Sequence, residues 1–299
     1  MQECVVADGV VSATPDERAL WTAIVVPEGV KERLRNHSLL AMRVRPQVPF
    51  TVTALHGLCT LYGPPGTGKT TLARGLPAQL APFVPGRQVR RIEINPHGLM
   101  SAEHGQSQQR VSELLAEYVP VLAGDDPAVV ILDEVESMAV ARSEASLAAN
   151  PADVHRATDA VLSALDHNAR QHPNLFFVAT SNFTTALDGA FLSRSDAAIL
   201  VPLPGPDAVQ QILENTLVSL AESFPGLREL ALSPGLAAVA AHAAGLDGRR
   251  VRKLVFEALS LRLETVLDPA ELTMHDLAAA AAAAEQDLAA QKENAHAAV

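Results

Sequence analysis

The stretch TLYGPPGTGKTTLARGL, residues 60–76, decides the fold. It matches the spacing G-x-x-x-x-G-K-[ST] through Gly63, Gly68, Lys69 and Thr70. A short apolar run precedes the glycines and a helical pattern follows them. Glycines let backbone N–H groups point inward, and the start of a helix adds partial positive charge. The pattern therefore predicts a phosphate-binding loop between a buried strand and a helix.

The side chains that close this loop predict which ligand it binds. Lys69 would bring a full positive charge to the β- and γ-phosphates of a nucleoside triphosphate, and the Thr70 hydroxyl would offer an oxygen ligand to Mg²⁺. The residues expected at the nucleotide are Gly63, Pro64, Pro65, Gly66, Thr67, Gly68, Lys69, Thr70 and Thr71.

Two later apolar runs end in polar residues that suit the same ligand. The run AVVILDEVES, residues 128–137, ends in Asp133, expected to hold Mg²⁺, and Glu134, expected to activate a water for attack on the γ-phosphate. In isolation this pair also fits an acidic helix cap, and the glycine loop favours the nucleotide. The run LFFVATSN, residues 175–182, would bring Asn182 to the γ-phosphate region, where it could position the water.

The remaining pattern predicts the organisation of the chain. Apolar runs at 57–62, 89–95, 128–133, 175–182 and 197–204 alternate with helical patterns, which favours an α/β fold with a parallel sheet covered by helices on both faces. From residue 207 onward the pattern is helical only: 207–223, 234–244, 248–265 and an alanine-rich stretch from about 274. We expect a short N-terminal arm (1–25), a nucleotide-binding α/β domain (26–205) and a small helical lid domain (206–299).

Composition narrows the classes of partner. Hydrophobic residues make up 48% of the 299 residues, enough for packed cores. The net charge of −11 and the 4% aromatic content disfavour a nucleic-acid-binding face. Two cysteines give no disulfide framework, and no signal peptide or bilayer-spanning run is present, so a cytoplasmic location without membrane contact is expected.

The order of these parts resembles the AAA+ ATPases, a class of P-loop NTPases. The glycine loop, the Asp-Glu strand and Asn182 are followed by Arg194 in DGAFLSRSDAAILVPLPGP and by Arg249 in GLDGRRVRKL. The resemblance implies hydrolysis of ATP with Mg²⁺, and a lid arginine, Arg249, that contacts the γ-phosphate within one subunit. It also implies an arginine finger, Arg194, that reaches the nucleotide of a neighbouring subunit. A homo-oligomer follows, usually a hexameric ring.

Four longer stretches are similar to one branch, the thyroid-receptor-interacting-protein-thirteen / pachytene-checkpoint-two family. They are LDEVESMAVARSE, DVHRATDAVLSALD, TSNFTTALDGAFLSRSDAAI and GLDGRRVRKLVFEAL, and the resemblance covers roughly residues 30–290. Family members remodel HORMA-domain proteins by pulling on their N-terminus. With only a short segment before the ATPase core, the chain resembles the bacterial family members found in antiphage signalling systems (CBASS). The implied partner is a HORMA-domain protein, alone or bound to a cyclic-oligonucleotide synthase, whose signalling complex would be disassembled.

One departure concerns the pore loop, where the family carries an aromatic residue. The corresponding segment here, NPHGLMSAEHGQSQQ, has none, and Met100, Glu103 and His104 are the pore-loop candidates. Either Met100 and His104 grip a threaded chain more weakly, or the substrate needs only a short pull.

Two other functions stay open on the sequence. One is an ATP-switched binding module that does no mechanical work, which an intact Glu134 and Arg194 disfavour. The other is an AAA+ unfoldase of a different protein or a loader in a nucleic-acid machine, and the acidic, aromatic-poor composition disfavours the loader.

Overall fold

The computed structural model describes residues 4–95, 106–139, 151–182 and 187–297. The chain forms two compact units: the first comprises residues 1–63 and 69–201, and the second residues 64–68 and 202–299. The sequence placed a domain boundary at 205–206, and the structure divides the chain at Val201 and Pro202. The five loop residues 64–68 group with the helical unit rather than with the sheet.

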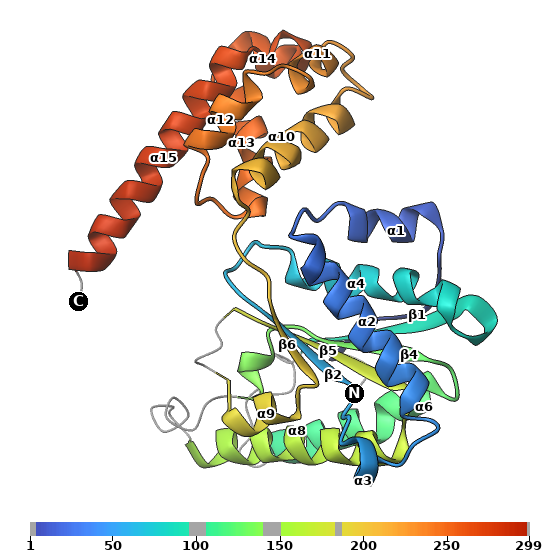
Figure 1. The fold of residues 1–299 in the computed structure, drawn as a ribbon. Helices are drawn as coiled ribbons and strands as arrows, with labels where there is room; N and C mark the ends of the chain where they lie inside the picture. The colour runs from blue at the N-terminus through green and yellow to red at the C-terminus, as the bar shows by residue number, and fades with distance from the viewer. Residues whose placement is uncertain (1–3, 96–105, 140–150, 183–186, 298–299) are drawn as a thin grey trace. The chain divides into compact units, whose positions relative to one another are not determined.

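The first unit is built on a six-stranded sheet in the order β1-β3-β4-β5-β2-β6 (Figure 1). Five strands run parallel, and β1 pairs antiparallel with β3 at the edge. The predicted α/β fold is confirmed, and the parallel sheet holds for all strands but the first. The strands are β1 (Val5–Ser12), β2 (Leu58–Tyr62), β3 (Gln88–Ile94), β4 (Ala128–Leu132), β5 (Leu175–Ser181) and β6 (Ala197–Leu200).

The N-terminal segment differs from the short arm that the sequence suggested. It supplies the edge strand β1 and the helix α1 (Pro15–Thr22), which packs on α4. Most side chains of β1 are exposed or half-exposed, so the strand lacks the apolar alternation that would reveal it. Its backbone ladder with β3 and an ion pair between Asp8 and Arg90 (2.8 Å) hold it in place.

Helices cover both faces of the sheet, as predicted. Phe176 and Val178 of β5 join a core with α1, α2 and α4, whereas Phe177 and Ala179 join a core with α5, α6, α8 and α9. Successive strand residues point to opposite faces, so an uninterrupted apolar strand is buried on both sides. The helices of this unit are α1, α2 (Glu28–Val44), α3 (Phe50–Thr53), α4 (Lys69–Leu80), α5 (Gln106–Ser112), α6 (Val119–Ala123), α8 (Pro151–Gln171) and α9 (Gly189–Arg194).

The second unit is helical from residue 206 onward. Its helices are α10 (Pro206–Leu220), α11 (Leu227–Ala231), α12 (Leu236–His242), α13 (Gly248–Ser260), α14 (Leu263–Leu267) and α15 (Met274–Ala297). The stretch 248–265, expected as one helix, divides into α13 and α14, and α11 was not foreseen. Leu213, Val251 and Leu277 are buried from three different helices, so this unit has a core of its own.

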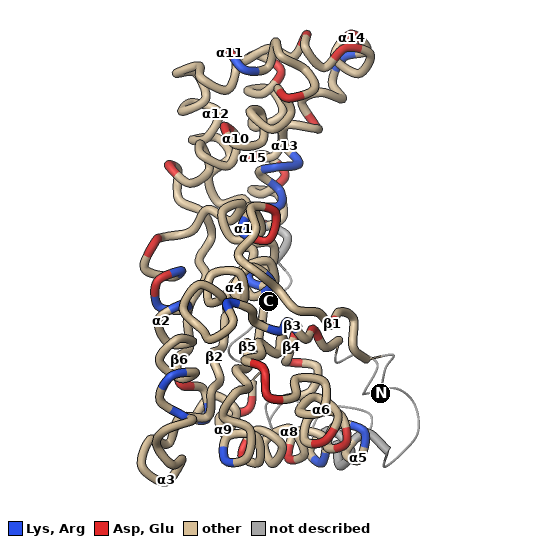
Figure 2. The backbone as a smooth tube through the Cα atoms, turned by 90° about the vertical axis from the view of Figure 1, so that its right-hand side faces the viewer, with Lys and Arg blue, Asp and Glu red and all other residues tan. Residues whose placement is uncertain are grey.

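Residues of both charges are distributed over the whole chain. Figure 2 shows Lys and Arg interspersed with Asp and Glu along the backbone. Within the described ranges, no helix is both long and apolar enough to cross a membrane.

Candidate functional site

The glycine loop between β2 and α4 has the backbone that its sequence predicted. Gly63, Gly66 and Gly68 have φ values of +143°, +76° and +95°, in the region that favours glycine. A Cβ on Gly63 would lie 2.3 Å from the backbone oxygen of Val201, so a side chain does not fit there. The loop therefore depends on glycine for its conformation and, at Gly63, for space.

Lys69 is the first residue of α4, and its ammonium group is held inside the loop. Its Nζ donates a hydrogen bond of 2.8 Å to the Gly63 carbonyl, and the residue is only 6% exposed. The Thr67 hydroxyl donates to the Pro64 carbonyl at 2.9 Å and closes the turn from the other side. A fixed positive charge near the start of a helix is suited to bind phosphate oxygens.

Thr70 and Asp133 meet where β4 ends beside the start of α4. The Thr70 hydroxyl donates to Asp133 Oδ1 at 2.7 Å. A hydroxyl and a carboxylate are oxygen ligands of the kind that Mg²⁺ takes, and Mg²⁺ usually keeps several waters and shares the ligand's phosphates. Thr70 and Asp133 therefore supply two oxygen atoms of the kind that this ion takes. In the part of the chain that is described, no cluster of three or more His, Cys, Asp or Glu suited to a metal occurs.

A second hydroxyl beside Asp133 was missed by the sequence analysis. Thr180, near the end of β5, donates to Asp133 Oδ1 at 2.5 Å and accepts from the backbone N–H of Glu134 at 3.1 Å. It is 1% exposed. The signal in the sequence was a threonine within the apolar run that ends at Asn182. A threonine in a buried strand is easily taken for a packing residue.

Glu134 follows β4 in a left-handed conformation, with φ 51° and ψ 52°. For a residue other than glycine this costs about 1–2 kcal/mol. The backbone turn leaves Glu134 exposed beside Asp133. Its hydrogen bond to Thr180 holds the backbone in this strained position. Such strain is common at active sites.

Asn182 reaches the same edge of the sheet, because β5 lies between β4 and β2 and runs parallel to both. Its backbone N–H donates to Glu136 Oε1 at 3.1 Å. Glu136 Oε2 is buried and has no hydrogen-bond partner among the residues that the structure describes. The structure thus brings Lys69, Thr70, Asp133 and Asn182 to one edge, and it adds Glu136 as a support for the backbone of Asn182.

Arg194 does not join this edge. It ends α9 just before β6, and Ala197 at the start of β6 pairs with Cys59 near the start of β2. The loop follows the other end of β2, four residues beyond Cys59, which is roughly 13 Å of strand. Arg194 therefore lies at the opposite edge of the sheet from the loop of its own chain.

The pore-loop candidates Met100, Glu103 and His104 fall outside the described residues.

Arg249 lies in the first turn of α13, in the second unit. The Asp247 carboxylate caps this helix by accepting from the N–H groups of Arg249 (2.9 Å) and Arg250 (3.0 Å). The Arg249 N–H also donates to the Gly66 carbonyl at 3.3 Å, within the same unit. The backbone of the expected lid arginine and the glycine loop are therefore neighbours.

This fold and this loop define a P-loop ATPase with the AAA+ arrangement: a glycine loop, an acidic strand end and an Asn-bearing strand, followed by a helical unit. Residues 59–203 match the AAA family, described as the ATPase family associated with various cellular activities. The chain is 45% identical over 267 residues to CD-NTase-associated protein 6 of Pseudomonas aeruginosa, covering 89% of this chain and 88% of that one. It therefore belongs to the AAA ATPases, in the branch that contains CD-NTase-associated protein 6.

Two further likenesses extend this result. The Pachytene checkpoint protein 2 homolog of Danio rerio is 29% identical over 265 residues, which cover 81% of this chain and 62% of that protein. A chain in the structure of the HORMA:CdnC:Trip13 complex of Escherichia coli MS115-1 has the same fold, with a TM-score of 0.69 at 16% identity over 94% of this chain and 95% of that one.

Proposed function

We propose that this ATPase remodels a HORMA-domain protein, working as a homo-oligomeric ring with six subunits as the expected number. Its action would disassemble a complex of that protein with a cyclic-oligonucleotide synthase in antiphage signalling. The observation that carries the proposal is the 45% identity to a CD-NTase-associated protein across 89% of the chain. The fold shared with a chain of the HORMA:CdnC:Trip13 complex supports the same partner.

The residues at the loop edge would divide the work of ATP cleavage. Lys69 would bind the β- and γ-phosphates with the loop N–H groups, and Glu134 would accept a proton from the attacking water. Thr70 and Asp133 would hold Mg²⁺, which supplies charge neutralisation of the phosphates when bound. Asn182 would orient the water. The 2.7 Å contact between Thr70 and Asp133 supports this assignment, because it joins both metal-binding oxygens at one point.

Two arginines would extend the site beyond this edge. Arg249 would contact the γ-phosphate from the first turn of α13, close to the loop residue Gly66. Arg194 would act on the nucleotide of a neighbouring subunit, because its own loop lies at the other edge of the sheet. An arginine supplied in this way contributes on the order of a thousandfold or more to the rate.

The test uses Glu134→Gln, which removes the base and keeps the size of the side chain. We expect this variant to bind ATP, to lower turnover by about 100- to 10,000-fold, and to retain a HORMA-domain protein in an ATP-dependent pull-down. Lys69→Ala, which loses phosphate binding, is the control that should retain nothing. Turnover near that of the unaltered protein would refute the role of Glu134. Equal capture by both variants would refute an ATP-dependent grip on the partner.

A further inference from the structure

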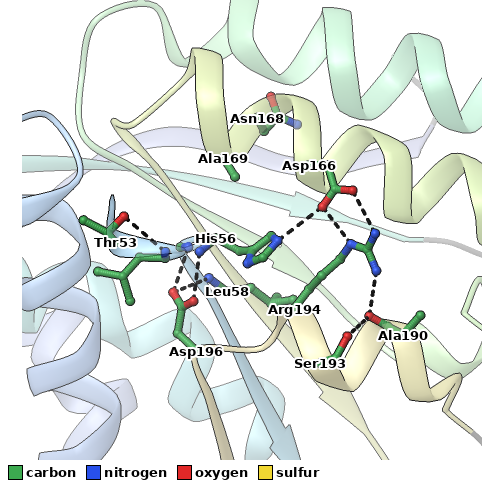
Figure 3. Close-up of polar contacts among 12 residues, drawn as sticks. Thr53, His56, Leu58, Asp166, Asn168, Ala169, Ala190, Ser193, Arg194 and Asp196 are labelled. Atoms are coloured by element: carbon green, nitrogen blue, oxygen red, sulfur yellow. Dashed lines mark hydrogen bonds and ion pairs between the residues drawn. The ribbon is translucent and has the colours of Figure 1, made fainter. Parts of the chain in front are cut away.

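Arg194 is held by a carboxylate on a different helix of its own chain. Its Nε and Nη2 donate to the two oxygens of Asp166 at 2.7 and 2.8 Å, and its Nη1 donates to the Ala190 carbonyl at 2.9 Å. Figure 3 shows Asp166 on α8 and Arg194 at the end of α9 pointing toward one another. Two parallel N–H···O bonds fix both the position and the plane of a guanidinium.

This pair is partly shielded from solvent. The side chains of Arg194 and Asp166 are 22% and 27% exposed. The hydrogen bonds from Arg194 lower the pKa of the Asp166 carboxyl, so Asp166 is charged at neutral pH. An exposed pair gains little because solvent screens it and both side chains must be ordered. The bidentate geometry and partial burial make this contact a fixed one.

Two further residues, His56 and Asp196, make contacts around the Arg194–Asp166 pair. The Nε2 atom of His56 lies 3.2 Å from Asp166 Oδ1, the same oxygen that accepts from Arg194 Nε. The Asp196 carboxylate accepts from the backbone N–H groups of His56 (2.9 Å) and Gly57 (2.8 Å). The segment that carries Arg194 is therefore attached to the start of β2 as well as to α8 (Figure 3).

We propose that Asp166 is the residue that positions Arg194 for the nucleotide of the neighbouring subunit. A guanidinium carries more N–H groups than its contacts with Asp166 and Ala190 use, so it can bind phosphate oxygens while Asp166 holds it. Asp166 fixes a long side chain that would otherwise occupy many rotamers. The inference rests on the proposed trans role of Arg194 and adds to it the residue that sets its geometry.

The first test compares ATP turnover of the assembled oligomer for Asp166→Asn, Asp166→Glu and Asp159→Asn. Asp166→Asn keeps the size and removes the charge, and we expect kcat to fall by about 10- to 100-fold with little change in KM for ATP, since misplacing a positioned group by about 1 Å costs this much. Asp166→Glu keeps the charge and should recover part of the rate. Asp159, exposed on the same helix without a side-chain partner among the described residues, is the matched control and should leave kcat unchanged.

A second test separates positioning of Arg194 from general weakening of the fold. When Asp166→Asn subunits are mixed with Lys69→Ala subunits, we expect turnover to recover, because the Lys69→Ala subunits supply an intact Arg194 to the sites of the others. A folded Asp166→Asn oligomer with unchanged kcat would overturn the inference. So would a mixture that stays inactive while a mixture of Arg194→Ala and Lys69→Ala is active. If the latter mixture is itself inactive, the shared site of the proposed function fails, and the role of Asp166 fails with it.

Discussion

At the end of β4, the hydroxyl of Thr180 connects two acidic residues for which we propose different roles. It donates to Asp133, the expected metal ligand, and accepts from the backbone of Glu134, the expected base. Glu134 is in a left-handed conformation that the chain does not favour. We infer that Thr180 keeps the base where it can reach the water.

Replacing Thr180 with valine tests this at the scale of one residue. Valine has nearly the same shape but no hydroxyl, so Asp133 and the Glu134 N–H each lose a partner. We expect the free energy of unfolding to fall by about 1–3 kcal/mol and kcat to fall about tenfold or more. Steady-state ATP turnover and urea denaturation measure the two effects.

Thr265→Val in the second unit is the matched control. Its hydroxyl is also buried and donates to the carbonyls of Leu259 (2.8 Å) and Arg262 (2.9 Å). We expect a similar loss of stability without a loss of kcat. If Thr180→Val behaves in the same way as this control, Thr180 has no part in positioning Glu134.

The candidate site residues that could be predicted from the sequence are those that belong to a short, continuous sequence pattern. Lys69 and Thr70 belong to one continuous motif, and Asp133 ends an apolar run. Asp166 and Thr180 act through partners elsewhere: Asp166 lies 28 residues before Arg194, and Thr180 lies 47 residues after Asp133. An isolated Asp on a helix or a Thr in a strand carries no signal until the fold brings its partner to it.

At the scale of one element, α15 begins with a capping box. The Asp276 carboxylate accepts from the Thr273 N–H (3.0 Å) and hydroxyl (2.7 Å), and the Asp276 N–H donates to the Thr273 hydroxyl at 3.3 Å. The same carboxylate accepts two hydrogen bonds from Arg262. These donors, Arg262 first, lower the pKa of Asp276 well below its usual range.

The lowered pKa gives this contact a defined pH dependence. A carboxyl with a lowered folded-state pKa stabilises the fold fully above its unfolded pKa of about 3.9, and this stabilisation is lost as the pH falls toward the folded-state value. We expect Asp276→Asn to lower the melting temperature by about 5 °C at pH 7, with the difference from the unaltered protein shrinking below about pH 4. Thermal unfolding followed at several pH values measures it.

Asp287→Asn is the matched control for this prediction, because Asp287 is exposed on the same helix. It should leave the melting temperature unchanged at every pH. A difference between Asp276→Asn and the unaltered protein that stays constant down to pH 3 would contradict the assignment of the effect to the Asp276 charge.

The elements that the sequence located best are those with continuous apolar runs. The strands β2, β4 and β5 are buried on both faces, so nearly all their residues are apolar and each strand is recognisable as a continuous apolar run. The edge strand β1 is mostly exposed and is held by backbone hydrogen bonds, which leave no trace in side-chain type. The short helix α11 is five residues long, less than the window over which a helical period can be recognised.

At the scale of the whole molecule, the residues proposed for catalysis lie at two edges of one sheet. Lys69, Thr70 and Asp133 are at the ends of parallel strands, and Arg194 is at their beginnings. One copy of the chain does not bring these two sets together within the first unit. A second copy would complete the site by placing its Arg194 at the loop of the first, and this separation supports the proposed site shared between subunits.

A mixing experiment tests that central claim most directly. Arg194→Ala subunits and Lys69→Ala subunits should each be inactive alone, and a mixture should hydrolyse ATP at least tenfold faster than either, because an intact Lys69 then meets an intact Arg194 at some interfaces. Turnover by Arg194→Ala alone near that of the unaltered protein would contradict the shared site. A mixture of well-assembled subunits that remains inactive would contradict it equally.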